Sequence, residues 1–168
     1  MAVFDPAEWV RALDAAGIEY VLVGGYAGVL HGARRPTIDI DIVPRWESRN
    51  LERLCDLLRA VDASSITGPT VEGDAITPEV LVEREVMTWQ SRLGRIDTLV
   101  GIPDADGMPV DYSQLIERAV RDDSLGVAVA VTSLDDLITS KEFAGRRKDV
   151  EALPELRRIR SERRGDES

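Results

Sequence analysis

Two aspartates alternate with isoleucines in the stretch TIDIDIV, residues 37–43. This alternation predicts a β-strand, because successive side chains of a strand point to opposite faces. Asp39 and Asp41 would then share one face, about 6.5 to 7 Å apart. The opposite face, toward the core, is expected to carry Ile38, Ile40 and Ile42. Two carboxylates side by side repel each other unless a cation lies between them. The chain must therefore fold around a strand whose polar face has a partner for this charge.

A pair of glycines, Gly24 and Gly25, ends the apolar run IEYVLV fourteen residues before Asp39. The run predicts a short buried strand, and the following YAGVLHGA predicts a short helix. Backbone N–H groups at such a turn form a natural phosphate cradle. Alone, a glycine pair is more often a tight turn, and an isolated D-x-D more often the wet side of a strand. Together they predict a phosphate cradle beside two carboxylates, which are ligands that Mg²⁺ takes alongside substrate phosphates.

Hydrophobic periodicity elsewhere predicts helices before, between and after the strands. Helices are expected over 6–16, 47–61, from 78, over 112–120 and over 134–145, then again after Gly145 with a break or restart at Pro154. Strands are expected over 84–90 and 95–102, as a hairpin, and over 126–132. With the two strands above, this gives an α/β (α+β) domain with a mixed sheet of about five strands.

Length and composition predict a single domain over 1–168, with 133–164 as a C-terminal helical segment. A single cysteine, Cys55, excludes an intrachain disulfide and a multi-cysteine metal site. No run approaches the roughly 20 apolar residues of a membrane span, so no membrane partner is expected. Residues 1–10 lack the pattern of a signal peptide, and a cytoplasmic location is expected.

Charge is unevenly distributed along the chain. The net charge is −10, which argues against a broad electrostatic grip on nucleic acid. Residues 141–164, however, contain 9 of the 21 basic residues and only 5 acidic ones. This segment could meet a polyanion, either a triphosphate or RNA, or could simply be a solvated basic helix.

Two further residues stand out because their charge falls in an apolar pattern. Asp97 is flanked by Ile96 and Leu99 in an expected strand, where a charge needs a partner. It is therefore the candidate third carboxylate. Lys141 continues the apolar stripe of its helix, so it either reaches toward the helix end or is aimed into a pocket to hold a triphosphate.

Other candidates are named by their position beside these motifs. Arg146 could add a phosphate contact, and Asp149 could be a base or an ion-pair partner. His31 could contact a nucleotide or be a packed structural residue. Arg35 and Thr37, which lead into the D-x-D strand, could touch phosphate or steady the loop.

The run GGYAGVLHGARRPTIDIDIV resembles the signature of the DNA polymerase β-like nucleotidyltransferase superfamily. More narrowly, its H-G-x-x-R-x-T-x-D-I-D segment and the later SLDDLITSKEFAGRRKDVEAL resemble the AbiEii/MenT-type nucleotidyltransferases. The resemblance covers roughly residues 18–160. It implies a polymerase β-like fold and a transfer of NMP from an NTP to an acceptor hydroxyl.

The resemblance also implies roles for individual residues. Gly24 and Gly25 would face the triphosphate, and Lys141 would grip it. Two Mg²⁺ ions, or Mn²⁺ in their place, would be held by Asp39, Asp41 and Asp97, and Asp97 would help to activate the attacking hydroxyl. Tyr26 departs from the pattern, because the superfamily often has Ser or Thr after the glycines to touch phosphate.

Many members of the narrower group are toxins of toxin–antitoxin or phage-defence systems. A toxin-like enzyme that acts on tRNA, with a separately encoded antitoxin, is therefore expected. One alternative is transfer to a protein or to a small molecule such as an aminoglycoside. The other is a catalytically inactive nucleotide- or partner-binding protein, which the tyrosine at position 26 would favour.

Overall fold

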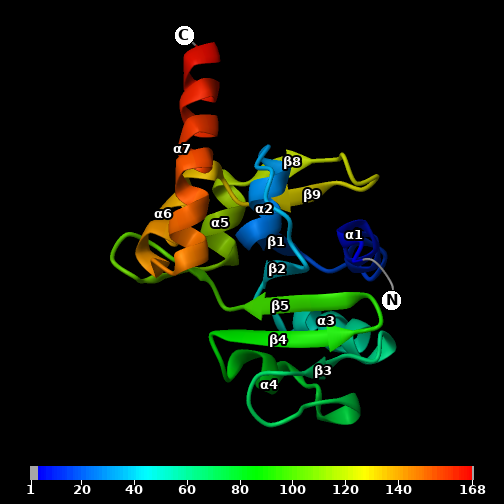
Figure 1. Cartoon of the computed structure of the whole chain (residues 1–168). Helices are drawn as coiled ribbons and strands as arrows, with labels where there is room; N and C mark the ends of the chain where they lie inside the picture. Colours follow the sequence, from blue (N-terminus) through cyan, green and yellow to red (C-terminus); the bar gives the residue numbers. More distant parts are fainter. Residues whose placement is uncertain (1–3, 168) are drawn as a thin grey trace.

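The computed structural model describes residues 4–167 (Figure 1). Residues 1–3 and 168 of the expected domain therefore lie outside the described residues. The helices are α1 (Pro6–Ala15), α2 (Gly24–Leu30), α3 (Ser48–Ala60), the 3-10 turn η1 (Gly73–Ala75), α4 (Pro78–Val82), α5 (Tyr112–Arg118), α6 (Leu134–Ala144) and α7 (Arg147–Asp166). The strands are β1 (Tyr20–Val23), β2 (Asp39–Pro44), β3 (Ser64–Ser65), β4 (Val86–Ser91), β5 (Gly94–Leu99), β6 (Ile102–Pro103), β7 (Pro109–Val110), β8 (Val120–Asp122) and β9 (Val129–Val131).

Seven of the strands form one mixed sheet in the order β3-β4-β5-β2-β1-β9-β8. β2 runs antiparallel to β1 and parallel to β5, and β1 runs parallel to β9. The five expected strands and the mixed sheet are confirmed, including the β4–β5 hairpin. The structure adds the edge strands β3 and β8 and a separate β6–β7 hairpin. These have two or three residues each, which is too short to show an alternating pattern.

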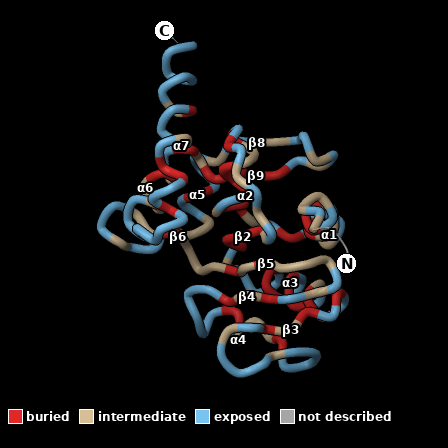
Figure 2. Tube along the Cα trace, in the orientation of Figure 1, coloured by how far each residue is buried: buried red, intermediate tan, exposed pale blue. Residues whose placement is uncertain are grey.

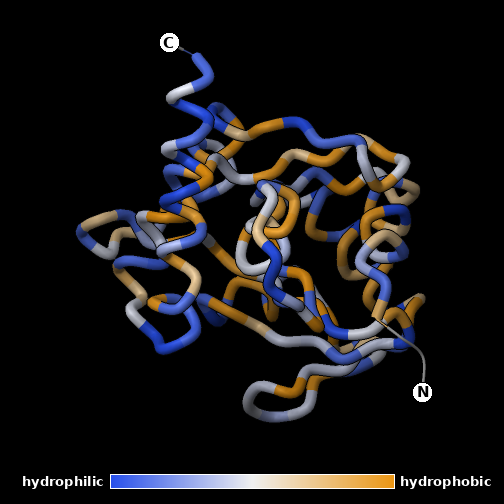
Figure 3. Tube along the Cα trace, turned by 45° about the horizontal axis from the view of Figure 1, so that its top comes forward, coloured by the Kyte–Doolittle hydropathy of each residue, from blue (hydrophilic) through white to orange (hydrophobic). Residues whose placement is uncertain are grey.

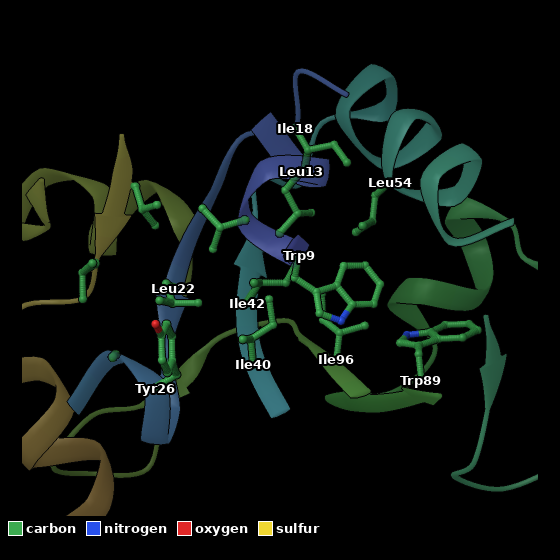
Figure 4. Close-up of a cluster of buried hydrophobic side chains, with 14 of the residues drawn as sticks. Trp9, Leu13, Ile18, Leu22, Tyr26, Ile40, Ile42, Leu54, Trp89 and Ile96 are labelled. Atoms are coloured by element: carbon green, nitrogen blue, oxygen red, sulfur yellow. The ribbon is translucent and has the colours of Figure 1, made fainter. Parts of the chain in front are cut away.

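The sheet separates two cores. The larger contains Trp9 of α1, Leu54 of α3, Ile40 and Ile42 of β2, and Ile96 of β5 (Figure 4). The smaller lies on the opposite face; its buried residues are Val21, Val23, Val43, Ile102, Val110 and Leu115. The buried segments in Figure 2 follow the inner strands and the inward sides of the helices. Because side chains alternate along β2, both aspartates of the D-x-D motif lie on the face of the smaller core.

Ile38 does not face the core, contrary to the sequence-based expectation. Its exposed fraction is 67%, whereas Ile40 and Ile42 are fully buried. The reason is that β2 begins only at Asp39. Ile38 lies in the preceding loop, where the alternation of a strand does not apply.

Helix α7 also differs from the expectation, because it passes through Pro154 without a break. Proline removes one backbone hydrogen bond and crowds the preceding turn. Pro154 lies on the exposed side of the helix, while Leu153 and Leu156 pack into the larger core. Tertiary packing on both sides of the proline holds the two halves in line.

The last turns of α7 extend beyond the rest of the molecule and carry the C-terminal end (Figure 1). They are exposed and hydrophilic (Figures 2 and 3). α7 is the longest helix, with 20 residues, but it is far from apolar. Within residues 4–167, no helix combines the length and the hydropathy that a bilayer-spanning segment needs.

Candidate active site

Three carboxylates meet on one face at the centre of the sheet. Asp39 and Asp41 lie two residues apart on β2, and Asp97 lies on the neighbouring β5. The parallel register pairs the Cα atoms of Asp41 and Asp97 directly. All three residues are half-buried. The structure thus brings together the D-x-D motif and the third acid that the sequence singled out; we refer to these three residues as the carboxylate site.

The carboxylate site is electrostatically unbalanced. Burial raises the pKa of Asp41 well above its ordinary value of 3.8, and the charges of Asp97 and Asp39 raise it further. Burial and the charge of Asp97 also raise the pKa of Asp39. Within the described residues, Oδ1 of Asp97 is buried and lacks any hydrogen-bond partner. Leaving such an acceptor unpaired costs about 1 to 3 kcal/mol. Among the described residues, none of the three side chains has an ion pair, and the positive charges nearby do not offset the raised pKa values of Asp39 and Asp41.

Gly24 allows the backbone between β1 and α2 to pass directly over Asp41. Its φ is +72°, and a Cβ atom at this position would lie only 2.1 Å from Oδ2 of Asp41. Any side chain would therefore displace the carboxylate. Gly25 is different: a Cβ there would meet only Oγ1 of Thr37, at an ordinary 3.9 Å. The N-terminus of α2 that follows has no side-chain cap, so its first N–H groups remain available to an anion.

The chemistry of the carboxylate site fits a hard cation that shares its coordination with phosphate. Carboxylate oxygens are the ligands that such a cation takes, and the unpaired oxygen of Asp97 would receive a partner. In the described part of the chain, no three His, Cys, Asp or Glu side chains already enclose a metal position. Mg²⁺ uses one or two carboxylates of a protein and completes its shell with water and substrate phosphates.

Thr37 holds the first aspartate of the pair, and the charge of Arg95 acts on it. The Thr37 hydroxyl lies 2.9 Å from the main-chain oxygen of Asp39 and 3.4 Å from its Oδ1, and it can donate to either. Arg95 lies opposite Asp39 in the register of β2 and β5. Its charge opposes the rise in the pKa of Asp39 that burial and Asp97 cause. Thr37 therefore steadies the loop and the aspartate together.

The α6–α7 junction contains a second group of charges, formed by Asp149, Lys141 and Arg146. Asp149 is 1% exposed and accepts hydrogen bonds from Nε of Arg146 at 2.7 Å and from Nζ of Lys141 at 3.4 Å. Burial alone would raise the pKa of Asp149, but the hydrogen bond and the charge of Arg146, together with Lys141, lower it overall. Lys141 is 14% exposed at its side chain. In the structure Asp149 is therefore an ion-pair partner, and both Lys141 and Arg146 are bound to it.

The charge of Lys148 acts on the carboxylate site, and the sequence pattern did not single this residue out. Its charge is the largest one that opposes the raised pKa of Asp39 and of Asp41, each of which is raised first by burial. The other eight basic residues of 141–164 all have a hydrogen-bonded or ion-paired partner in the structure; they are Lys141, Arg146, Arg147, Arg157, Arg158, Arg160, Arg163 and Arg164. Sequence alone offered one signal for Lys148: it is the second of only two lysines.

His31 is buried and uses both ring nitrogens within the protein. Nε2 lies 2.7 Å from the carbonyl oxygen of Thr132, and Nδ1 lies 2.9 Å from a guanidinium nitrogen of Arg163. A carbonyl only accepts and a guanidinium only donates, so Nε2 carries the proton and Nδ1 accepts. Burial, with the charge of Arg163, lowers the pKa of His31 although the bond to Thr132 opposes this. These contacts favour the structural role among the two that the sequence allowed.

Tyr26 and Arg35 also lie among other protein groups. The side chain of Tyr26 packs beside Leu22 in the larger core (Figure 4), so only its backbone N–H could face a phosphate. Arg35 donates to Glu151 of α7 at 3.2 Å. It ties the loop before β2 to the helix.

Comparison with known proteins gives a family and a fold. A family model described as a nucleotidyltransferase of unknown function (DUF6036) matches residues 2–159. No curated protein matches the chain.

Three solved structures with the same fold are distant in sequence. A lincosamide antibiotic adenylyltransferase with bound lincomycin is 14% identical, with a TM-score of 0.63, over 95% of this chain and 99% of its own. An antigenic nucleotidyltransferase-like protein from Paracoccidioides brasiliensis is 16% identical, with a TM-score of 0.53, over 89% and 72%. A nucleotidyltransferase from Thermotoga maritima is 15% identical, with a TM-score of 0.52, over 88% and 91%. The expected nucleotidyltransferase fold is confirmed, while the narrower AbiEii/MenT resemblance stays a prediction.

Proposed function

The chain belongs to the nucleotidyltransferases of family DUF6036, and from this premise we propose that its carboxylate site transfers an NMP from an NTP to an acceptor hydroxyl. One observation carries the proposal. Asp39, Asp41 and Asp97 gather on one face with raised pKa values at the first two and an unpaired buried oxygen at the third. A fold does not maintain such repulsion for stability, so the site is best explained by a cationic ligand.

The proposed reaction is a displacement at the α-phosphorus of the NTP. The acceptor oxygen forms a bond to this phosphorus, the bond to the β-phosphate oxygen breaks, and pyrophosphate leaves. The hydroxyl proton passes to a carboxylate, for which Asp97 is proposed. Such a reaction asks the protein mainly for positioning and for neutralisation of charge.

Asp39, Asp41 and Asp97 are proposed to hold two Mg²⁺ ions, or Mn²⁺, which when bound would neutralise the phosphates and align the displacement. Gly24 brings the backbone directly against Asp41, and the uncapped N-terminus of α2, which includes the backbone N–H of Gly25, is proposed to offer N–H donors to the triphosphate.

We propose tRNA as the first acceptor to test, with the chain acting as the toxin of a pair whose antitoxin is encoded separately. This proposal rests on the AbiEii/MenT resemblance and on the basic composition of residues 141–164. Nothing in the fold itself selects this acceptor.

A small hydroxyl-bearing molecule is the second candidate acceptor. It is favoured by the pairing of Arg157, Arg160 and Arg164 with acidic side chains, which reduces the positive surface that α7 offers to RNA. Of the chains with this fold, one is a lincosamide antibiotic adenylyltransferase. Lincomycin and aminoglycosides therefore belong among the acceptors to be tested.

The experiment is incorporation of label from each α-³²P-NTP in turn, with Mg²⁺ or Mn²⁺, into total tRNA, protein, lincomycin or aminoglycosides. The wild type is compared with the Asp39→Ala/Asp41→Ala double variant, and both are checked for folding by circular dichroism. We expect label on one acceptor class with the wild type alone. Equal labelling by the folded double variant would refute the role of the carboxylates. Absence of label on every acceptor with the wild type would count against the transfer reaction.

A further inference from the structure

Lys148 is the unpaired cation of the C-terminal segment. Among the described residues its ammonium group makes neither an ion pair nor a hydrogen bond, although the side chains of its eight basic neighbours within 141–164 all do. Its side chain is exposed. A lysine with this freedom can move its charge by several ångströms at little cost in energy. The location of this charge is therefore defined only if the backbone of Lys148 is held in place.

The backbone that carries Lys148 is fixed on both sides. Gly145 takes a left-handed conformation, with a φ of 60°, and turns the chain from α6 into α7. The next residue along from Lys148 is Asp149, which is buried and held by Lys141 and Arg146. The first turn of α7 is thus anchored through the Asp149 group, and Lys148 projects from an anchored position.

A second set of contacts places this turn beside the start of β2. Glu151 follows Lys148 by three residues, so the two lie next to each other on the surface of α7. Glu151 accepts a hydrogen bond from Arg35, in the loop that leads into β2. Two residues further on, the Thr37 hydroxyl bonds to Asp39. The turn that carries Lys148 therefore lies beside the start of β2, in agreement with the effect of the Lys148 charge on the pKa of Asp39 and of Asp41.

Lys141, in contrast to Lys148, is neither unpaired nor exposed. It is nearly buried, and its ammonium group is engaged with Asp149. Its withdrawal would leave Asp149 with one cationic partner fewer in a site that is 1% exposed. Breaking a buried pair of this kind is expensive, whereas Lys148 has no partner to give up.

We propose that Lys148, rather than Lys141, binds the β- and γ-phosphates of the NTP and stabilises the departing pyrophosphate. The inference rests on the proposed transfer reaction and names a binding residue for it. In the free protein the charge of Lys148 acts on Asp39 and Asp41. When a cation neutralises the carboxylates, the ammonium group is free to turn to the phosphates. Lys141 keeps a structural task, which is to hold Asp149 and with it the turn that presents Lys148.

The test is equilibrium binding in the presence of Mg²⁺ without any acceptor, so that it does not depend on turnover. The ligands are each of the four NTPs, the corresponding NMPs and inorganic pyrophosphate. The proteins are the wild type, Lys148→Gln, Lys148→Arg and the control Arg147→Gln. Arg147 is the adjacent residue, is 94% exposed and pairs only with Glu151 among the described residues, so the control removes the same charge from the same turn.

We expect Lys148→Gln to weaken binding of the NTP and of pyrophosphate by about tenfold or more, as for a hydrogen bond to a charged group. NMP binding should be unchanged, because an NMP lacks the phosphates that Lys148 contacts. Lys148→Arg should retain most of the affinity, and Arg147→Gln should match the wild type. Loss of NMP and NTP affinity in equal measure would contradict the assignment to the β- and γ-phosphates.

Two outcomes separate a failure of this inference from a failure of the proposed reaction. If the wild type binds an NTP and Lys148→Gln binds it equally well, the inference is wrong while the reaction stands. If the wild type binds no NTP at all, the proposed reaction and the inference fall together. Lys141→Gln, measured alongside, should show a lowered melting temperature with NTP affinity retained in its folded fraction.

Discussion

The carboxylate site on β2 and β5 and the Asp149 group at the α6–α7 junction both remove acidic side chains from water, with opposite results. At the junction the protein supplies two cations, and the pKa of Asp149 is lowered. On the sheet it places three acids together, and the pKa of Asp41 is raised well above 3.8. Both regions lie in one small fold, so the difference is not one of general environment.

This contrast separates a structural charge from a functional one. A carboxylate whose pKa is lowered by its protein partners contributes to the stability of the fold. A carboxylate whose pKa is raised by burial and by like charges lowers that stability when ionised, and it is retained for another reason. From the sign of the pKa shift, together with the ion pairs of Asp149, we propose that Asp149 belongs to the scaffold and Asp41 to the chemistry. Four measurements can break or sharpen this division.

The largest effect is expected for Asp41→Asn. Stabilisation by a metal ion is worth several kcal/mol in such reactions, so losing a ligand should reduce transfer by about a hundredfold or more. The melting temperature should stay the same or rise, because a repelling charge is removed. Transfer rate and calorimetric melting, measured on one preparation, check both statements. A melting temperature several degrees lower would place Asp41 with the scaffold.

The converse is expected for Asp149→Ala. Lys141, at 14% exposed, would lose its buried partner, whereas Arg146, at 64% exposed, would still reach water. We therefore expect the low end of the range for a broken buried pair, a loss of about 3 kcal/mol in the free energy of unfolding. Urea denaturation measures it. A change below the error of the fit would show that the junction is not held by this pair.

A smaller effect separates the two glycines. Gly24→Ala places a Cβ where Oδ2 of Asp41 now lies and forces a left-handed conformation, a strain of about 1 to 2 kcal/mol. We expect transfer to fall by about tenfold as Asp41 shifts. Gly25→Ala, with open space at its Cβ, is the matched control and should be close to the wild type. Similar rates for the two variants would argue against a fixed position for Asp41.

The smallest effect is a dependence of stability on pH without metal. The folded pKa values of Asp39 and Asp41 are raised, so their contribution is fully present below the ordinary value of 3.8 and is lost as the pH rises through the raised values. Asp149 has a lowered pKa, and its contribution is lost only as the pH falls through that value. Melting temperatures from about pH 4 to pH 7 should decline by a few degrees in EDTA.

Mg²⁺ should remove this decline, because it supplies the missing charge. The Asp39→Asn/Asp41→Asn double variant is the control and should show neither the decline nor the response to Mg²⁺. A decline of the same size in the double variant would assign it to other groups.

The sequence predicts well which carboxylates come together, and their surroundings less well. The alternation of aspartate and isoleucine predicted that Asp39 and Asp41 share one face of a strand. The apolar neighbours of Asp97 marked it as an acid that needs a partner. These are local signals, and the sheet register then joined them. Ile38 was misplaced because the start of a strand depends on pairing with its neighbours, which no local pattern contains.

The surroundings of Lys148 could not be predicted from the sequence for a related reason. Its orientation depends on the left-handed turn at Gly145, on the burial of Asp149 and on the tie between Arg35 and Glu151. Lys141 looked the better candidate because it continued an apolar stripe. The same burial brings the ammonium group of Lys141 to Asp149, and the two form an ion pair. The continuity of α7 through Pro154 likewise depends on packing against the core, which overrides the local preference of proline.

The repulsion among Asp39, Asp41 and Asp97 also bears on how descendants of this chain would drift. A copy released from selection for its reaction would gain stability by replacing any of these acids with a neutral residue, so such replacements would accumulate early. The same copy could not dispense with Asp149 and still fold well. An inactive descendant should therefore carry altered residues on β2 and β5 above an intact helical junction. In such a descendant, substitutions at Asp39, Asp41 and Asp97 should precede substitutions at Asp149.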